Sequence, residues 1–98
     1  MKNIISNLNK IFESRIRLGI MSVLIINDSL DFNTLKETLD VTDGNLASHL
    51  KTLEDKKLIK VKKKFIGRKP NTRYFITEHG SQQFNQHLNA LENLINSK

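Results

Sequence analysis

Apolar residues recur at helical intervals over much of this chain. Leu46, Leu50 and Leu53 lie three or four residues apart, and at about 100° per residue they converge on one side of a helix. The opposite side carries small and hydrogen-bonding residues and no large apolar group. Thr42 is suited to cap the helix, because its hydroxyl can accept from a free backbone N–H. We therefore predict a helix over residues 43–56 with one face against a core and the other facing a partner or water.

A second helical repeat precedes this one. Residues 32–39 place two leucines four positions apart, and either Asp31 or Asn33 is available as the N-cap. Only residues 40–42 separate the two segments, and so short a turn between amphipathic helices is typical of a helix-turn-helix. The second helix of that arrangement enters the major groove of DNA. The pair alone would favour the alternative, a helical hairpin packed in a core, because short helix pairs are common.

Two further helices are predicted before the pair. Ile4 to Phe12 repeat apolar residues every three or four positions, which predicts a short amphipathic helix within residues 1–13. Residues 14–26 have so little polar surface that they should form the central helix of the core. Turn-forming residues follow at 27–29, and residues 30–32 are long enough for a very short strand.

The C-terminal third changes period. Residues 59–66 mostly alternate apolar and basic positions, which is typical of a half-buried strand. Gly67, Pro70 and Asn71 interrupt the pattern, and residues 72–77 return as a second strand rich in β-branched and aromatic side chains. We therefore predict a hairpin with a basic tip. A long helix capped by Thr77 then runs to about residue 96.

Positive charge is concentrated on this hairpin. The chain has 16 Lys and Arg against 10 Asp and Glu, a net charge of +6. Nine of the basic residues fall between Lys56 and Arg73, and no acidic residue lies among them. A solvated hairpin that uses lysines to protect its edges is the alternative, but such a surface usually mixes charges of both signs. The absence of acids therefore favours a polyanionic partner, with phosphate contacts along the hairpin.

Several classes of protein are disfavoured by what the chain lacks. Its 98 residues suffice for one domain with one modest core. It has no Cys, which excludes disulfides and thiolate metal sites, and no apolar run approaches the roughly 18 residues of a membrane span. No Gly-rich phosphate loop or catalytic motif is present, so we expect no enzyme activity and no cofactor. We expect a cytoplasmic protein without a membrane partner.

The order of these elements, together with three sequence motifs, resembles the winged-helix domain of MarR-like and ArsR-like transcriptional regulators. The motifs are LxxxLxVTDGNLxxHLxxLExxxLI, the hairpin end GRxPxTRYxIT, and TEHG at the start of the last helix. The resemblance covers about residues 14–96, and implies an α+β, mainly α, winged helix-turn-helix with a two-stranded β-hairpin wing and a long C-terminal helix. One departure is Lys57, because such domains often place Gly there to end the recognition helix in a left-handed conformation.

We therefore expect residues 1–98 to form a single winged-helix domain with an N-terminal helix (1–13), a winged helix-turn-helix core (14–77) and a C-terminal dimerisation helix (78–98). The resemblance bears on the central part. It implies that the recognition helix 43–56 lies in the major groove and that the basic wing 62–73 lies on the backbone or in the minor groove. The helix face selected by periodicity is the same one, and Asn, Ser and Thr can hydrogen-bond to bases. The predicted DNA-binding residues are Thr42, Asn45, Ser48, His49, Lys51, Thr52, Lys62, Lys64, Arg68, Lys69 and Arg73. For His49, packing beside the core is the alternative to a phosphate contact.

The last helix carries an apolar seam at spacings of four, three and four, which is heptad-like. Packing of this seam on the chain's own core is the alternative, but the central helix and the hairpin already cover that core. We therefore predict a homodimer through this helix, so that two recognition helices face successive major grooves. The predicted interface residues are Phe84, Leu88, Leu91, Leu94 and Ile95.

We thus expect a homodimeric, sequence-specific regulator of transcription that binds double-stranded DNA. The alternatives are a winged helix that docks an acidic protein and a winged helix that binds RNA. ArsR-like regulators often sense metals, but His79 and His87 without a cysteine make no recognisable ligand set, so we predict no metal site. A small-molecule effector is compatible with the resemblance but is not indicated by the sequence.

Overall fold

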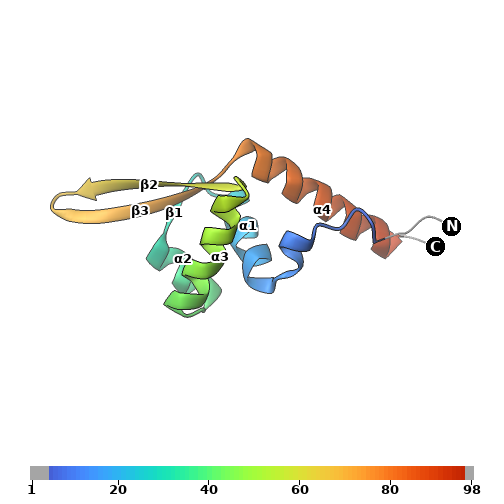
Figure 1. Cartoon of the computed structure of the whole chain (residues 1–98), viewed down its shortest axis with the longest axis horizontal. Coiled ribbons are helices and arrows are strands. Elements are labelled where there is room, and N and C mark those ends of the chain that lie inside the picture. The colour runs from blue at the N-terminus through green and yellow to red at the C-terminus, as the bar shows by residue number, and fades with distance from the viewer. Residues whose placement is uncertain (1–4, 97–98) are drawn as a thin grey trace.

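A computed structural model describes residues 5–96 and shows four α-helices and a small antiparallel sheet (Figure 1). This confirms the predicted α+β, mainly helical, fold class. The wing projects from one end of the body, so the molecule is 59 Å long but only 25 Å and 21 Å across. In chain order the elements are η1 (Lys10–Glu13, a 3-10 helix), α1 (Arg15–Ile25), β1 (Leu30–Asp31), α2 (Phe32–Leu39), α3 (Asp43–Asp55), β2 (Ile59–Ile66), β3 (Lys69–Ile76) and α4 (Glu78–Asn96).

Helix α1 is the centre of the core, as its almost wholly apolar sequence predicted. Ile20, Met21 and Leu24 are completely buried, and α1 contacts η1, α2, α3, β3 and α4. The leucine stripe of α3 is also fully buried against this core. Burial of apolar surface on α1 and α3 therefore fixes the orientation of the polar side of α3.

The helix-turn-helix forms with the predicted caps. The Asp31 carboxylate, and not Asn33, accepts from the Thr34 N–H at 2.7 Å at the start of α2. Asp40 ends α2 in the left-handed region, with φ 52°. Thr42 Oγ1 then accepts from the Asn45 N–H at 3.2 Å and starts α3. Each helix end therefore has a local partner that satisfies its backbone.

The wing, which we define as residues 59–76, is longer than the sequence predicted. Strands β2 and β3 pair from Ile59 with Ile76 to Ile66 with Lys69, and Gly67 and Arg68 form a two-residue turn. The second strand thus begins at residue 69 and not at 72. Hydrogen-bonded and non-hydrogen-bonded residue pairs alternate along an antiparallel ladder. Phe65 and Pro70 form a non-hydrogen-bonded pair, so the missing N–H of Pro70 costs no ladder bond.

One junction joins the end of α3 to both the wing and α4. Lys57 has φ 60°, and the Leu58 N–H donates to the Leu53 carbonyl at 3.0 Å, which closes α3 with a Schellman motif. The Thr77 N–H donates to the Leu58 carbonyl at 3.1 Å, and Thr77 Oγ1 accepts from the Gly80 N–H at 2.8 Å. A Cβ on Gly80 would overlap the Leu58 carbonyl oxygen, so this close approach of α4 requires glycine.

The prediction of an amphipathic helix within residues 1–13 was wrong for its described part. Residues 5–8 form turns, and only the single 3-10 turn η1 follows; residues 1–4 lie outside the described residues. The cause is Asn9, whose side chain caps η1 at the Ile11 N–H while its own N–H donates to His87 Nδ1 at 2.9 Å. A backbone N–H used by a distant histidine cannot continue a local helix.

Helix α4 packs part of its apolar seam on its own chain. Phe84 is only 2% exposed and meets Phe12 edge to face, with ring centroids 5.3 Å apart. His87, one turn on, is also buried against Phe12. The prediction that Phe84 contributes to a dimer interface is therefore wrong for this fold, because its surface is already buried within one chain.

The conformation of Lys57 yields a stability prediction. A side chain in the left-handed region is strained, so Lys57→Gly should raise the free energy of unfolding by about 0.5–1 kcal/mol in urea denaturation. Lys56→Gly is the matched control, because Lys56 has φ −86° and gains nothing from glycine. It should lower stability by about 0.5–1 kcal/mol. Equal losses from both changes would contradict the strain at Lys57.

The buried His87 yields a pH prediction. Burial lowers its pKa below the ordinary value of 6.5, although the Glu13 carboxylate opposes this shift. The folded state therefore binds fewer protons than the unfolded state, and the stability present above about pH 6.5 should fall as the pH falls. His87→Asn keeps a neutral acceptor for the Asn9 N–H and should flatten the fall in unfolding free energy between about pH 7.5 and 5.5. The control His79→Asn, on the exposed side of α4, should leave the slope unchanged; an unchanged slope in His87→Asn as well would sink the assignment.

Candidate nucleic-acid interface

The outward side of α3 is a continuous polar surface. Asn45, Ser48 and Lys51 are exposed, and Thr42 is exposed at the N-terminal end of the helix. The leucines of α3 occupy the other side and are buried in the core. The periodicity of the sequence therefore identified the exposed face correctly, and α3 presents side chains with both donors and acceptors.

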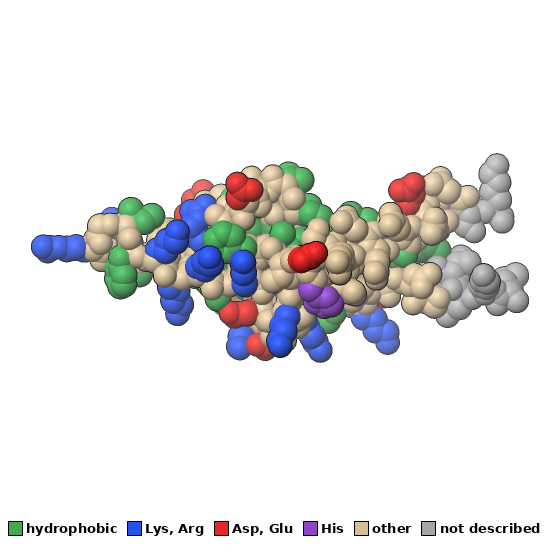
Figure 2. All heavy atoms as spheres, turned by 90° about the horizontal axis from the view of Figure 1, so that it is seen from above, with side chains coloured by type: hydrophobic (Ala, Val, Ile, Leu, Met, Phe, Trp, Pro, Cys, Tyr) green, Lys and Arg blue, Asp and Glu red, His purple; other side chains and the backbone are tan. Residues whose placement is uncertain are grey.

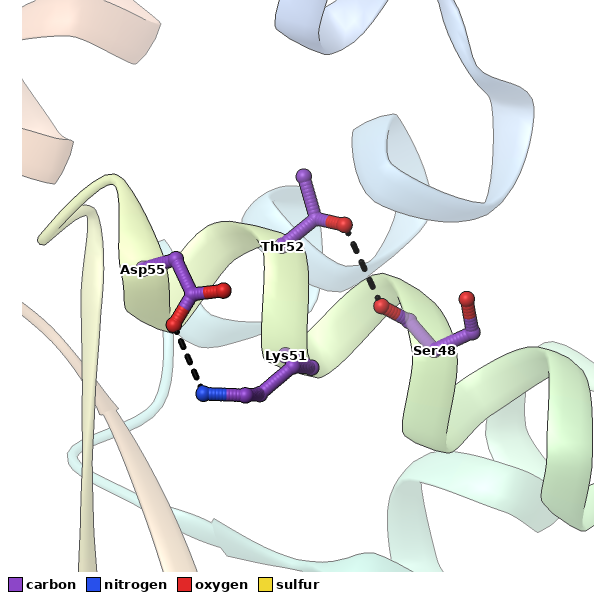
Figure 3. A network of polar contacts seen from close by, with 4 residues as sticks. All are labelled: Ser48, Lys51, Thr52 and Asp55. Atoms are coloured by element: carbon purple, nitrogen blue, oxygen red, sulfur yellow. Dashed lines mark hydrogen bonds and ion pairs between the residues drawn. The ribbon is translucent and has the colours of Figure 1, made fainter.

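Two of the predicted side chains have partners within α3 (Figure 3). Lys51 Nζ lies 2.8 Å from Asp55 Oδ1, and the Thr52 hydroxyl donates to the Ser48 carbonyl at 3.2 Å. Hydrogen bonding and charge from Asp55 raise the pKa of Lys51, but the pair is solvent-exposed and hence weak. Lys51 can therefore exchange Asp55 for another anion at small cost.

His49 lies on the flank of α3, where Arg17 holds it. Arg17 Nε donates to His49 Nδ1 at 3.0 Å, and Arg17 Nη1 donates to the Ile11 carbonyl at 3.2 Å. Burial and the Arg17 charge both lower the pKa of His49. The histidine is thus held neutral as an acceptor for Arg17, which favours the packed alternative in the sequence analysis over a charged phosphate contact.

A groove of about 420 Å³ separates α3 from the wing. From α3 it is lined by Ala47, Leu50, Lys51 and Glu54, and from the wing by Val61, Lys63, Thr72 and Tyr74. Burial raises the pKa of Tyr74, and the Glu54 carboxylate adds to the shift. Lys51 and Lys63 line the groove from opposite sides and can contact phosphates, while Glu54 adds one negative charge to the lining.

Lys63 lines the groove but is not among the predicted DNA-binding residues. Strand alternation places it on the same face as Ile59 and Val61, and the register pairs it with Thr72. The predicted contacts Lys62, Lys64 and Lys69 are exposed but belong to the opposite face. The alternating apolar pattern could have located Lys63, because Ile59 and Val61 already marked the side that faces the body.

Arg73 is half-buried and bonded within its own chain. Its Nε donates to Ser29 Oγ at 2.8 Å and its Nη2 donates to the Ser29 carbonyl at 3.0 Å. It pairs with Asp31 of β1 in the sheet register. In this conformation Arg73 braces the base of the wing, and a DNA contact by Arg73 stays a prediction.

The remaining basic residues follow the wing outward. Figure 2 shows Lys and Arg side chains along the projecting hairpin and at its end. Lys60 and Lys62 lie over the Phe75 ring, at 5.7 Å and 5.5 Å from its centroid, which shields that ring on the outer face. Arg68 and Lys69 are exposed at the turn. The charge is therefore carried away from the body by the length of the hairpin.

Other kinds of site find no support in the described residues. Between residues 5 and 96, no three His, Asp or Glu side chains are grouped so that they could hold a metal ion. No helix in that range is both long and apolar enough to cross a bilayer.

Comparison with known proteins agrees with this geometry. Residues 16–95 match the family model described as a winged helix DNA-binding domain. An uncharacterised protein of Methanocaldococcus jannaschii is 39% identical over 79 residues, which are 81% of this chain and 86% of that protein.

Solved structures show the same fold. A transcriptional regulator homologue from Pyrococcus horikoshii is 33% identical, with a TM-score of 0.84 over 95% of this chain and 90% of that one. Bacillus subtilis PadR, solved in complex with operator DNA, is 18% identical, with a TM-score of 0.68 over 76% of this chain and 46% of PadR. A MarR-family regulator from Silicibacter pomeroyi is 16% identical, with a TM-score of 0.69 over 96% of this chain and 64% of that one. The family match over most of the chain and the 33% identical regulator show that this chain belongs to the winged-helix DNA-binding domain family.

Proposed function

We propose that this protein is a homodimeric transcriptional regulator that recognises a specific sequence in double-stranded DNA. The observation that carries the proposal is the continuity of one surface. The polar side of α3 borders the groove lined by Lys51 and Lys63, and the groove leads to the acid-free wing. Two proteins of the same fold support this proposal: PadR, solved in complex with operator DNA, and the transcriptional regulator homologue from Pyrococcus horikoshii.

The surface divides into two kinds of contact. Asn45 and Ser48 are exposed on α3, where an amide can pair with adenine and a hydroxyl with several bases. Lys51 and Lys63 face the groove, where one DNA backbone would pass between helix and wing. Arg68 lies at the far turn of the wing, within reach of the minor groove or a phosphate. We thus assign the recognition of bases to α3. The wing is assigned the phosphate contacts that position the protein on DNA and raise its affinity.

The dimer is proposed through the outer side of α4. Leu88 is 40% exposed and Ile95 is 82% exposed, with Leu91 and Leu94 half-buried between them. Exposed large apolar residues on one helix are costly in water unless another surface covers them. Without Phe84, the proposed interface is this C-terminal part of α4, and a two-fold axis there would pair two recognition helices.

The experiment that tests the function is selection from a randomised duplex pool, with sequencing, at two salt concentrations. We expect enrichment of an inverted repeat, because a two-fold dimer reads two half-sites about one helical turn apart. Leu88→Glu places a charge in the proposed interface and should leave single half-sites enriched and a monomer in light scattering. The control is Gln86→Glu, because Gln86 is exposed on nearly the opposite side of α4 from Leu88, and this variant should keep the repeat. Binding that fades with salt without any enrichment would reject sequence-specific recognition.

A second experiment separates the two kinds of contact. Asn45→Ala should cost about 1–3 kcal/mol on the selected site and almost nothing on random duplex, which relaxes specificity at particular base pairs. Arg68→Ala should weaken all duplexes alike and lower the slope of log K against log salt by about 1. Lys10→Ala removes a positive charge from η1, away from the wing, and should change neither quantity. Equal effects of Asn45→Ala on all sequences would refute its role in reading bases.

A further inference from the structure

The end of the wing is apolar as well as basic. Phe65 is 75% exposed and Ile66 is 65% exposed, and they are neighbours in the chain. Figure 2 shows hydrophobic side chains on both flanks of the hairpin end, among basic ones. These large apolar groups lie near the end of the hairpin, and the fold leaves more than half of each in water. They therefore suggest a surface that a partner covers.

The two residues belong to opposite faces of the wing. Phe65 lies on the same strand face as Lys63 and Val61, because every second residue shares a face. It therefore continues the face that lines the groove beside α3. Ile66 pairs with Lys69 on the outer face. Only Phe65 therefore lies on the side to which we assign the DNA, and Ile66 is its matched counterpart.

We propose that Phe65 is an apolar wedge that enters the minor groove of double-stranded DNA and partly unstacks one base step. The proposal rests on the function proposed above and adds a specificity-determining residue to it. Charge complementarity selects DNA as the occupant, because Lys63, Lys64, Arg68 and Lys69 surround the tip and no acidic residue lies between positions 56 and 73. Apolar wedges flanked by cations are a recurring means of kinking a duplex from the minor groove.

The turn is shaped for a close approach to DNA. It contains only two residues, and Gly67, with φ +65°, has no side chain and nothing within 4 Å of where a Cβ would lie. A narrow tip suits a groove about 6 Å wide. The cost of unstacking is least at flexible pyrimidine–purine steps. Phe65 should therefore create a preference for TA or CA/TG at a fixed distance from the bases that α3 reads.

The experiment uses the full chain and the selected duplex with 2-aminopurine at the step that the wing covers. Wild-type protein should raise the probe's emission severalfold, because unstacking relieves its quenching, and should favour a TA step over a stiff AA step there. Phe65→Ala should lose the increase in emission and most of the preference for the TA step, but keep the slope of log K against log salt. Ile66→Ala should keep the emission increase, the step preference and the salt slope. Both residues are exposed, so circular dichroism should show both variants folded.

The outcomes separate the wedge from the proposed function. If neither the wild type nor any variant selects a duplex sequence, the proposed function fails. If the wild type selects a site but Phe65→Ala matches it in emission and step preference, the wedge is refuted while the function stands. If Phe65→Ala instead abolishes binding to phosphatidylserine vesicles and leaves the duplex measurements intact, the tip docks on an anionic membrane and the wedge is likewise overturned.

Discussion

The contact on which the rest of the structure depends is the approach of α4 to the carbonyl of Leu58. That oxygen accepts the Thr77 N–H, and Gly80 lies so close to it that no side chain fits between. Three elements meet there, since Leu58 follows α3, precedes the wing and supports the start of α4. The angles among α3, the wing and α4 are therefore fixed by backbone hydrogen bonds and close packing.

Polar side chains extend this rigidity to the flanks of the interface. Arg17 links α1, η1 and His49 of α3, and Arg73 links the base of the wing to Ser29 before β1. Each of these cations makes bonds within the chain from a half-buried position, where bidentate or paired hydrogen bonds are strongest. The basic side chains that remain exposed on the groove and the wing are free of such bonds to the core within the described residues and can contact phosphates. Basic residues that hold the fold together are thus distinct from those available to a partner.

Local order along the chain was predictable from residues and their spacing. Leucine repeats, Thr42 and Asp31 as caps, the alternation from Ile59 and the TEHG segment define helices and strands through near neighbours alone. The exposed side of α3 followed from the same periodicity. The predictions that went wrong are the helix within residues 1–13 and the place of Phe84 in a dimer interface. Asn9 bonds to His87 and Phe84 packs on Phe12, and both contacts join the two ends of the chain.

Residue spacing, capping residues and charge along the chain thus predicted the helix-turn-helix, the basic hairpin and the polar face of α3, and carried the family resemblance. Which residues share a surface depends on the tertiary structure. Lys63 lines the groove and Arg73 is hydrogen-bonded to Ser29. Phe84 is buried in the core, and Phe65 is exposed near the tip of the wing. The physical reason is that periodicity and capping act within about one helical turn or one strand pair. Which face is covered, and which cation is already bonded, depends on elements brought together only by burial of the common core.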